Sequence, residues 1–514
     1  MNTFNYESYK EQITVFPRIT YAEFAKMTDK AVKISIIEKN KILKTDAYNR
    51  TMKKIRWEKG DLHEWYTLTY RKNAGDGFNI VYGIKNMLLE LFGTKVTQWE
   101  LDFATEFYKH EADKWWNNNF NREMRQEVID KHDGHVPIEV KAVRDWSAMK
   151  AWEPILAVNW HGELSAIYEP VFMHPTYQSI VATDGLIINQ LMHEWRIDLW
   201  IHADEYGWRS AINAGQHFDA IEALYVATWL EATSHDAASA VFPQVHTSGT
   251  IAHRFLSSYA SEMESFEAII QHAIATWQKK CTLLIDLINS YQWIEKAIAL
   301  KKKYENYGLS ITIRLDSGKL KDQVIYSLKR LQQEWLLDPK SWKIVVAGIE
   351  NEGEIAEIEQ AVRKEWYNPR DYVYYWLGEL FISRNKGRSR VSTWFKLAET
   401  EERKTWKRSD DEGKRSIPWN LNVEIRDNKR FIVQDEEKVN GERLLQTVYK
   451  DGELKYGSDD FAYMDEARKY LIENFEKVFL PTEVSEATQK AQQQVNAWFQ
   501  GQMDDPLYAK REVA

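Results

Sequence analysis

The chain has 514 residues, 44% hydrophobic and 28% charged, which is enough for two or three globular domains. A formal net charge of −9 argues against a general nucleic-acid binder, because phosphate backbones require a basic surface. The single cysteine, Cys281, excludes an intramolecular disulfide and a cysteine-based zinc site. No apolar run approaches the length of a membrane span and the first residues lack a signal-peptide pattern, so we expect a cytoplasmic protein with no membrane partner.

The first third of the chain predicts a mixed α+β domain. Residues 1–40 combine charged and aromatic side chains and are interpreted as an N-terminal extension. "VYGIKNMLLELFG" (residues 81–93) predicts a helix that ends at Gly93, whereas "HVPIEVKAV" (residues 135–143) alternates apolar and polar side chains and predicts a strand. We assign residues 41–180 to this domain.

Residues 280–385 alternate short apolar runs with helical segments, which is typical of a parallel α/β sheet or barrel. The runs "CTLLIDLI", "LSITIRLDSG", "WKIVVAGIE" and "YVYYWLG" predict four buried strands. Between the last two, "EGEIAEIEQAVRKEW" (residues 352–366) predicts an amphipathic helix. The predicted apolar face of this helix consists of Ile355, Ile358, Val362 and Trp366.

Functional side chains are expected where these strands end, because parallel α/β folds place their sites at the carboxyl ends of strands. The four ends carry Asp286, Asp316, Gly348 and Gly378. His253, in "GTIAHRF", precedes the first of these strands and could belong to the same edge, or could simply be the polar member of a helix start.

These residue types suit sugar-phosphate chemistry. A carboxylate behind a histidine orients the imidazole and stabilises its cation. Carboxylates can hold ribose hydroxyls or Mg²⁺, and turn glycines let backbone N–H groups approach phosphate. The sequence "RLDSG" (residues 314–318) equally suits an ordinary strand exit in which Asp316 caps its own loop.

A series of short motifs runs from residue 45 to residue 454. They are "TDAYNRTM", "DGHVPIEVKAV", "EYGWRS", "GTIAHRF", "LIDLIN", "IRLDSGKL", "VVAGIE" and "QTVYKDGEL". In this order the set resembles the nicotinamide phosphoribosyltransferases, within the wider family that includes the nicotinate phosphoribosyltransferases. The resemblance implies an α/β fold, an incomplete TIM-like barrel over residues 181–395 with an N-terminal mixed α+β domain. Residues 396–514 would complete the mixed domain, with "QTVYKDGEL" as a strand pair and a polar helical tail.

The resemblance also implies an activity and roles for residues. Such enzymes are homodimers with shared active sites that transfer phosphoribosyl from phosphoribosyl pyrophosphate to the ring nitrogen of nicotinamide, with Mg²⁺. ATP hydrolysis drives the step through a phosphorylated histidine, which would be His253, oriented by Asp286. We therefore predict that these two side chains approach within about 2.6–3.2 Å, or through one water. Tyr206 and Arg314 would sandwich the pyridine ring, and Tyr48 would come from the partner subunit. The other substrate-binding residues would be Asp46, Arg209, Ser234, Asp316 (at the ribose), Gly348 and Gly378.

The phosphate-binding elements depart from the family pattern. "YWLGELF" (residues 375–381) stands where a glycine-rich loop is expected, and Trp376 and Leu377 leave less room for an anion. Ile349 replaces an expected aspartate, and Ser210 replaces an expected glycine. These changes support the interpretation of the chain as a catalytically weakened dimeric relative with a binding or structural role.

The substrate remains open between the amide and the acid. In "ATSH" (residues 232–235), Ser234 stands where nicotinamide enzymes carry aspartate and nicotinate enzymes carry serine. A hydroxyl tolerates a carboxylate that an aspartate would repel. The leading hypothesis is a nicotinamide phosphoribosyltransferase that makes nicotinamide mononucleotide in NAD salvage, and the alternative enzyme uses nicotinate.

Overall fold

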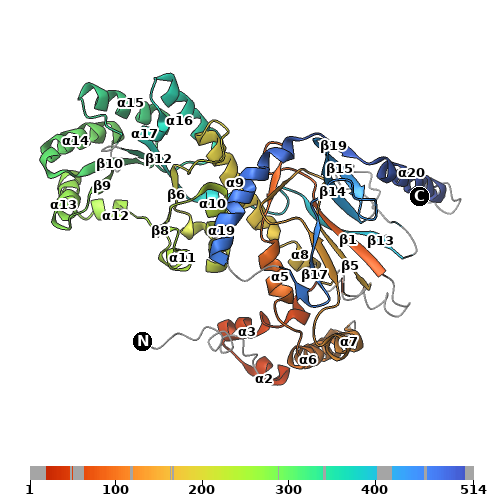
Figure 1. Ribbon diagram of the computed structural model, residues 1–514. Coiled ribbons are helices and arrows are strands. Elements are labelled where there is room, and N and C mark those ends of the chain that lie inside the picture. Colours follow the sequence, from red (N-terminus) through yellow and green to blue (C-terminus); the bar gives the residue numbers. More distant parts are fainter. Residues whose placement is uncertain are drawn as a thin grey trace, which may run out of the picture.

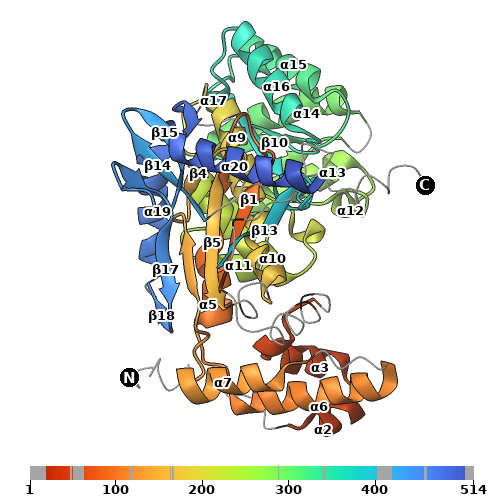
Figure 2. The ribbon, with the colours of Figure 1, turned by 90° about the vertical axis from the view of Figure 1, so that its right-hand side faces the viewer.

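The structure is a computed structural model that describes residues 19–46, 49, 52, 63–115, 120–161, 164, 167–249, 251–286, 289–339, 343–401, 404, 420–455 and 460–503. Two sheet-based parts lie side by side, and a group of N-terminal helices lies at one end (Figures 1 and 2). Each part has its own large hydrophobic core. Among the described residues, no helix combines the length and hydropathy that a membrane span requires.

A seven-stranded parallel sheet curls into an open barrel. Its strands, in spatial order, are β8 (His246–Thr247), β7 (Ala232–Thr233), β6 (Ala203–Glu205), β12 (Val373–Leu377), β11 (Ile344–Val346), β10 (Ser310–Leu315) and β9 (Lys280–Leu284). β12 pairs with β6, whereas β8 and β9 are edge strands, so the barrel is open between them. This confirms the predicted incomplete α/β barrel and the predicted pairing of its four strands.

Helices between successive strands cover the outside of the barrel (Figure 1). The longer ones are α10 (Ala214–Thr228), α13 (Glu262–Ala275), α14 (Ser290–Lys303), α15 (Leu320–Gln333) and α16 (Glu352–Lys364). The shorter ones are α11 (Asp236–Val241), α12 (His253–Leu256), α17 (Pro369–Tyr372) and α18 (Glu379–Ile382). Three residues of the predicted apolar face of α16 are buried, but Trp366 is 96% exposed. That part of the prediction is wrong because α16 ends at Lys364 and the chain then turns away.

The second part is built on a six-stranded sheet that joins distant parts of the chain. Its strands, in spatial order, are β13 (Thr393–Thr400), β1 (His63–Tyr70), β5 (Pro154–His161), β3 (Glu139–Ala142), β17 (Gln446–Lys450) and β18 (Glu453–Leu454). β17 and β18 confirm the predicted strand pair. β3 is shorter than predicted because Pro137 has no N–H for a ladder, and the Ile138 N–H donates locally to the Val136 carbonyl.

Smaller elements surround this sheet. They are α2 (Tyr21–Lys26), α3 (Lys30–Ile37), η1 (Lys41–Leu43), α5 (Ile84–Phe92), α6 (Gln98–Trp115), α7 (Arg122–His132), α8 (Glu169–Phe172), the strand pair β2 (Asn79–Val81) and β4 (Ser147–Met149), and the sheet of β16 (Glu442–Arg443), β14 (Leu421–Arg426), β15 (Lys429–Gln434) and β19 (Thr482–Val484). α5 ends at Gly93, as predicted. Two further helices are α19 (Asp460–Asn474) and α20 (Glu486–Met503), of which α20 corresponds to the predicted helical tail. The stretch "ETEERKTWKRSDDEGKR" (residues 399–415), whose many charges predict a surface loop, lies largely outside the described residues.

Helix α9 (Pro175–Met192) links the two parts. Most of its side chains are buried, and it contacts α10 and α16 of the barrel as well as β2. Its central position in Figure 1 agrees with these contacts. Helix α9 is therefore packed against both parts of the molecule and anchors the barrel to the second part.

Candidate active site

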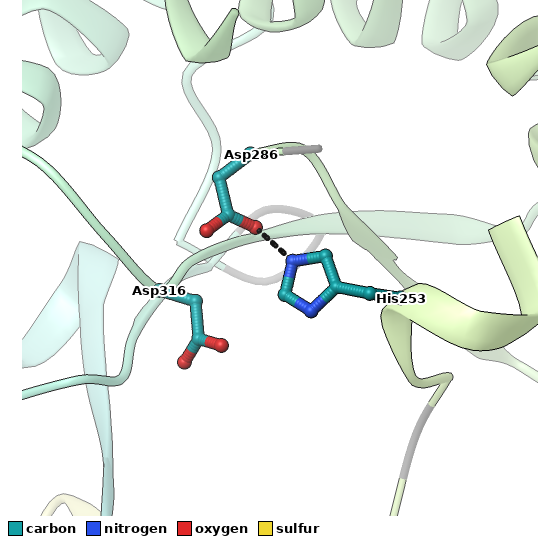
Figure 3. Close-up of side chains that lie close together, drawn as sticks. All are labelled: His253, Asp286 and Asp316. Carbon is teal, nitrogen blue, oxygen red and sulfur yellow. Dashed lines mark hydrogen bonds and ion pairs between the residues drawn. The ribbon is translucent and has the colours of Figure 1, made fainter. Parts of the chain in front are cut away.

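His253 and Asp286 meet at the carboxyl end of the barrel. His253 is the first residue of α12, and Asp286 follows β9. His253 Nε2 lies 2.9 Å from Asp286 Oδ1 (Figure 3), which confirms the predicted contact. The Asp286 side chain is 4% exposed and that of His253 is 42% exposed. A buried carboxylate thus holds one edge of the imidazole while the other edge remains accessible.

The exit of β10 supplies the next groups. Ser317 Oγ donates to Asp286 Oδ2 at 2.6 Å, so Asp286 contacts both His253 and Ser317. Asp316 Oδ1 lies 2.9 Å from Arg314 Nη2. Asp316 therefore pairs with a cation of its own strand, which also fixes the direction of the Arg314 guanidinium.

His253, Asp286 and Asp316 together form a compact donor set. One ligand atom from each lies within 4.8 Å of the other two, and Figure 3 shows the Asp316 carboxylate beside the pair. Carboxylate oxygens are the ligands that Mg²⁺ prefers, and imidazole binds several divalent cations. The chemistry of this donor set fits a divalent cation.

The expected ring site contains a side chain of the protein itself. In the barrel, β12 lies between β6, which leads to Tyr206, and β11, which is followed by β10 with Arg314. The Trp376 indole stacks on Tyr206 with a centroid distance of 4.6 Å and an interplanar angle of 20°. The Arg314 guanidinium carbon lies 5.2 Å from the centre of the same indole. Trp376 thus contacts both residues that were expected to sandwich a pyridine ring, so the expected open sandwich is absent here.

Polar groups inside the barrel hold Tyr206 in place. Its hydroxyl lies 2.9 Å from Ser248 Oγ, and Ser248 donates to Asp204, which also accepts from Tyr374. Burial raises the pKa of Asp204, although the two donated hydrogen bonds oppose this shift. Trp376, Tyr374 and Asp204 line a cavity of about 1110 Å³ in the barrel interior.

The two predicted glycines, Gly348 and Gly378, lie after the carboxyl ends of barrel strands β11 and β12. Gly348 has φ = +70°, and a Cβ atom there would lie 2.3 Å from the Asp316 carbonyl oxygen. Only glycine lets the ends of β10 and β11 approach so closely. Gly378 precedes α18, and a Cβ atom there would lie 3.4 Å from the Tyr206 carbonyl oxygen. Both residues therefore border the site formed by Tyr206 and Asp316.

The remaining predicted residues are more dispersed. Arg209 is exposed in η2 (Trp208–Ser210), and half-buried Ser234 follows β7, where its N–H donates to the Glu205 carbonyl at 2.9 Å. Asp46 is exposed after η1, among the N-terminal helices rather than on the barrel. Tyr48 lies outside the described residues.

Sequence reasoning missed Ser317 and Ser248 as partners of the site. Ser317 was detectable, because it directly follows Asp316 in "RLDSG". Ser248 was not, because its contact with Tyr206 depends on β8 lying two strands away from β6. It also missed a buried network on the outer face of β6 and β7, in which Glu205 lies 3.1 Å from His217 Nε2 and accepts from the Thr233 hydroxyl at 2.6 Å.

Comparisons with known proteins give the fold first. A nicotinate-nucleotide pyrophosphorylase from Pyrococcus furiosus is similar to this chain with a TM-score of 0.62 and 15% identity, over 88% of this chain and 98% of that one. The human nicotinic acid phosphoribosyltransferase is similar with a TM-score of 0.62 and 18% identity, over 88% and 99% of the two chains. The architecture of an open α/β barrel joined to a mixed domain is therefore shared with these proteins along nearly the whole chain.

The sequence comparison matches one domain. Residues 40–140 match the family model of the nicotinamide phosphoribosyltransferase N-terminal domain. No curated protein sequence matches the chain. The matched domain therefore covers about a fifth of the chain, and the shared architecture shows that the chain has the fold of these phosphoribosyltransferases.

Proposed function

We propose that this chain transfers the phosphoribosyl group of phosphoribosyl pyrophosphate to the ring nitrogen of nicotinamide, giving nicotinamide mononucleotide for NAD salvage. The observation that carries the proposal is the His253–Asp286 pair beside Asp316 at the carboxyl end of the barrel. The match of residues 40–140 to the nicotinamide enzymes supports the choice of acceptor.

In this reaction the bond between ribose C1′ and the pyrophosphate oxygen breaks, and a bond between C1′ and the pyridine nitrogen forms. Positive charge develops at C1′ as pyrophosphate leaves, and the nearby carboxylates of Asp286 and Asp316 stabilise it. Arg314, held by Asp316, would face the acceptor ring. The carboxylates of Asp286 and Asp316 would hold Mg²⁺, which would neutralise charge on the leaving pyrophosphate.

His253 is the proposed acceptor of a phosphoryl group from ATP. The terminal P–O bond of ATP breaks, ADP leaves, and a P–N bond forms at the imidazole. Nε2 is bound to Asp286, so the other ring nitrogen, which points away from Asp286 in Figure 3, is the nucleophile. Asp286 stabilises the positive charge that the imidazole gains.

Nicotinate is the second candidate acceptor, and Ser234 is the observation that favours it. Its neutral hydroxyl, on the loop after β7, adds no charge that would repel a carboxylate. We also propose that the chain works in the cytoplasm as a homodimer, with Tyr48 of the partner subunit completing each site. The single, buried cysteine fits a reducing compartment.

A pyrophosphate-release assay with nicotinamide or nicotinate, with and without ATP, tests the proposal. We expect release that depends on a pyridine and is enhanced by ATP. His253→Ala should abolish the ATP enhancement and leave a slower basal transfer. No release with either pyridine would support the non-catalytic relative instead, and equal ATP enhancement in His253→Ala would show that His253 is only structural.

A further inference from the structure

Tryptophan occupies an unusual number of left-handed backbone positions in this chain. In its described part, fourteen residues other than glycine have positive φ, and seven of them are tryptophan. They are Trp146, Trp152, Trp195, Trp229, Trp277, Trp335 and Trp366. Asparagine and aspartate tolerate this conformation, but a bulky residue with positive φ is an outlier, because its Cβ approaches the following carbonyl. One such residue would be a local oddity, but seven of one type need a common cause.

Three of these tryptophans end helices in the same way. Trp277, Trp335 and Trp366 each stand two residues after the last residue of α13, α15 or α16. In each case the following N–H returns to a carbonyl in the last turn, from Gln278, Leu336 and Tyr367 at 2.9, 2.9 and 3.2 Å. This is the Schellman arrangement, whose left-handed position is usually glycine.

Packing does not explain these tryptophans. Trp277, Trp335 and Trp366 are 91%, 95% and 96% exposed, so their indoles bury almost nothing to offset the backbone strain. The composition points the same way: the chain has 22 tryptophans and only 22 glycines, whereas glycine usually makes up about 7% of a protein, or about 36 residues here. The backbone at these positions is the one that glycine adopts.

Trp376 differs from these residues, because its backbone is that of a strand and its indole is packed. It lies within β12, and its indole contacts both Tyr206 and Arg314, the two residues proposed to hold the pyridine ring. A flat ligand that binds between Tyr206 and Arg314 must therefore displace the indole, which weakens its binding. A glycine at this position would leave that space open and would let a backbone N–H approach an anion.

We infer that these tryptophans stand at positions built for glycine, and that glycine at position 376 is the form of the chain in which the ring site is open. One codon, UGA, is read as tryptophan in some genetic codes and as glycine in another, so a gene of the second kind places glycine at all these positions together. The part that concerns position 376 rests on the proposed function, whereas the part that concerns the helix ends does not.

Stability measurements test the helix ends. Trp277→Gly, Trp335→Gly and Trp366→Gly should each raise the midpoint of thermal unfolding, by roughly 1–3 °C, because each relieves left-handed strain at an exposed site. Trp200→Gly is the matched control, since Trp200 is 54% exposed but its backbone is not left-handed, and it should not raise the midpoint. A lower midpoint in all three helix-end variants would overturn the inference.

Calorimetric titration with nicotinamide and with nicotinate tests position 376. Trp376→Gly should bind one of the pyridines about tenfold more tightly than the unaltered chain, or more, and Trp376→Ala should show part of this gain. Equal affinity in all three proteins would overturn the inference for position 376. If the helix-end variants gain stability but no protein binds a pyridine, the proposed function fails and the glycine positions stand.

The mass of the protein isolated from the cells that encode it is decisive. Peptide mass spectrometry should find glycine at positions 277, 335, 366 and 376. Tryptophan at all four would overturn the explanation from the genetic code.

Discussion

Asp286 is the residue on which the proposed chemistry depends most. It is nearly inaccessible to solvent, yet it accepts from the Ser317 hydroxyl and contacts the His253 imidazole. Because the Asp286 carboxylate is buried and has two such partners, it stays in the same position when the charge of the His253 imidazole changes. It therefore determines which imidazole nitrogen remains open.

The variant Asp286→Asn removes the negative charge of the side chain and keeps its size. The amide has the same size, but it lacks the negative charge that would stabilise a phosphorylated or protonated imidazole. We expect the ATP enhancement of pyrophosphate release to fall by about 100-fold, with a smaller loss in the absence of ATP. Steady-state kinetics at several ATP concentrations would measure both losses. Equal losses with and without ATP would mean that Asp286 does not act through His253.

Ser234→Asp tests the edge of the ring site. An aspartate accepts a hydrogen bond from an amide but repels a carboxylate, and like charges about 4 Å apart cost on the order of 4 kcal/mol at an effective dielectric of 20. Because Ser234 is half-buried, solvent screens part of this energy. We expect the ratio of kcat/KM for nicotinamide to that for nicotinate to rise by about tenfold or more. An unchanged ratio would show that Ser234 is not at the ring edge.

Among the elements, α16 shows how the outer layer is tied to the barrel. Ile355, Ile358 and Val362 are buried, and on the same helix buried Glu359 accepts from the Tyr375 hydroxyl of β12 at 3.0 Å. Arg363, one turn later, lies 2.9 Å from the other Glu359 oxygen. The Glu359 carboxylate of α16 is therefore buried between the helix and the barrel sheet, where it joins the two layers.

Burial raises the pKa of Glu359 to about 7, although Arg363 and the Tyr375 hydroxyl oppose the shift. Since this value exceeds that of the unfolded chain, folding takes up a proton, and stability should fall as pH rises from about 4.5 to 7. Glu359→Gln removes this term, so the free energy of unfolding of wild type should fall by up to about 3 kcal/mol relative to the variant across that window.

Urea denaturation of both proteins at several pH values measures the difference in slope. Glu357→Gln is the control, because Glu357 lies on the same helix but is exposed. It should leave the pH dependence of wild type unchanged. Parallel curves for wild type and Glu359→Gln would contradict the prediction.

At the scale of the whole molecule, a buried ion pair joins segments that are far apart in the chain. Arg430 of β15 makes two hydrogen bonds, at 2.6 and 2.8 Å, to Glu153, which directly precedes β5. The two side chains are 1% and 0% exposed. The four-stranded sheet is therefore attached to the six-stranded sheet by a charged contact that water does not reach.

Arg430→Met should destabilise the protein by about 3–5 kcal/mol, because it leaves the Glu153 carboxylate buried without a cation. The double variant Arg430→Met, Glu153→Leu should recover part of the loss, because it removes both charges. The neighbouring Lys429→Met is the control, since Lys429 and Glu483 form an exposed pair and the change should cost less than about 1 kcal/mol. Chemical denaturation measures all three, and equal losses from Arg430→Met and Lys429→Met would contradict the role of the buried pair.

The sequence by itself determined the local features of this protein. Apolar runs that end in Asp286 and Asp316 predicted the barrel strands, and the resemblance of short motifs to a known family paired His253 with Asp286. The strand predictions depend on the periodicity of apolar side chains and on the direction of the chain. Both can be read from a short segment of sequence. The helix that ends at Gly93 was predictable for the same reason.

Only the tertiary structure decided which side chains share a space. Trp376 was expected to crowd a phosphate, but the order of the strands places its indole against Tyr206 and Arg314 instead. Trp366 fits the apolar face of α16 by spacing and is nevertheless exposed, because the helix ends before it. In both cases the outcome depends on strand order or on where a helix stops, and these follow from packing between segments that are distant in the chain. A pattern within one segment contains no record of that packing.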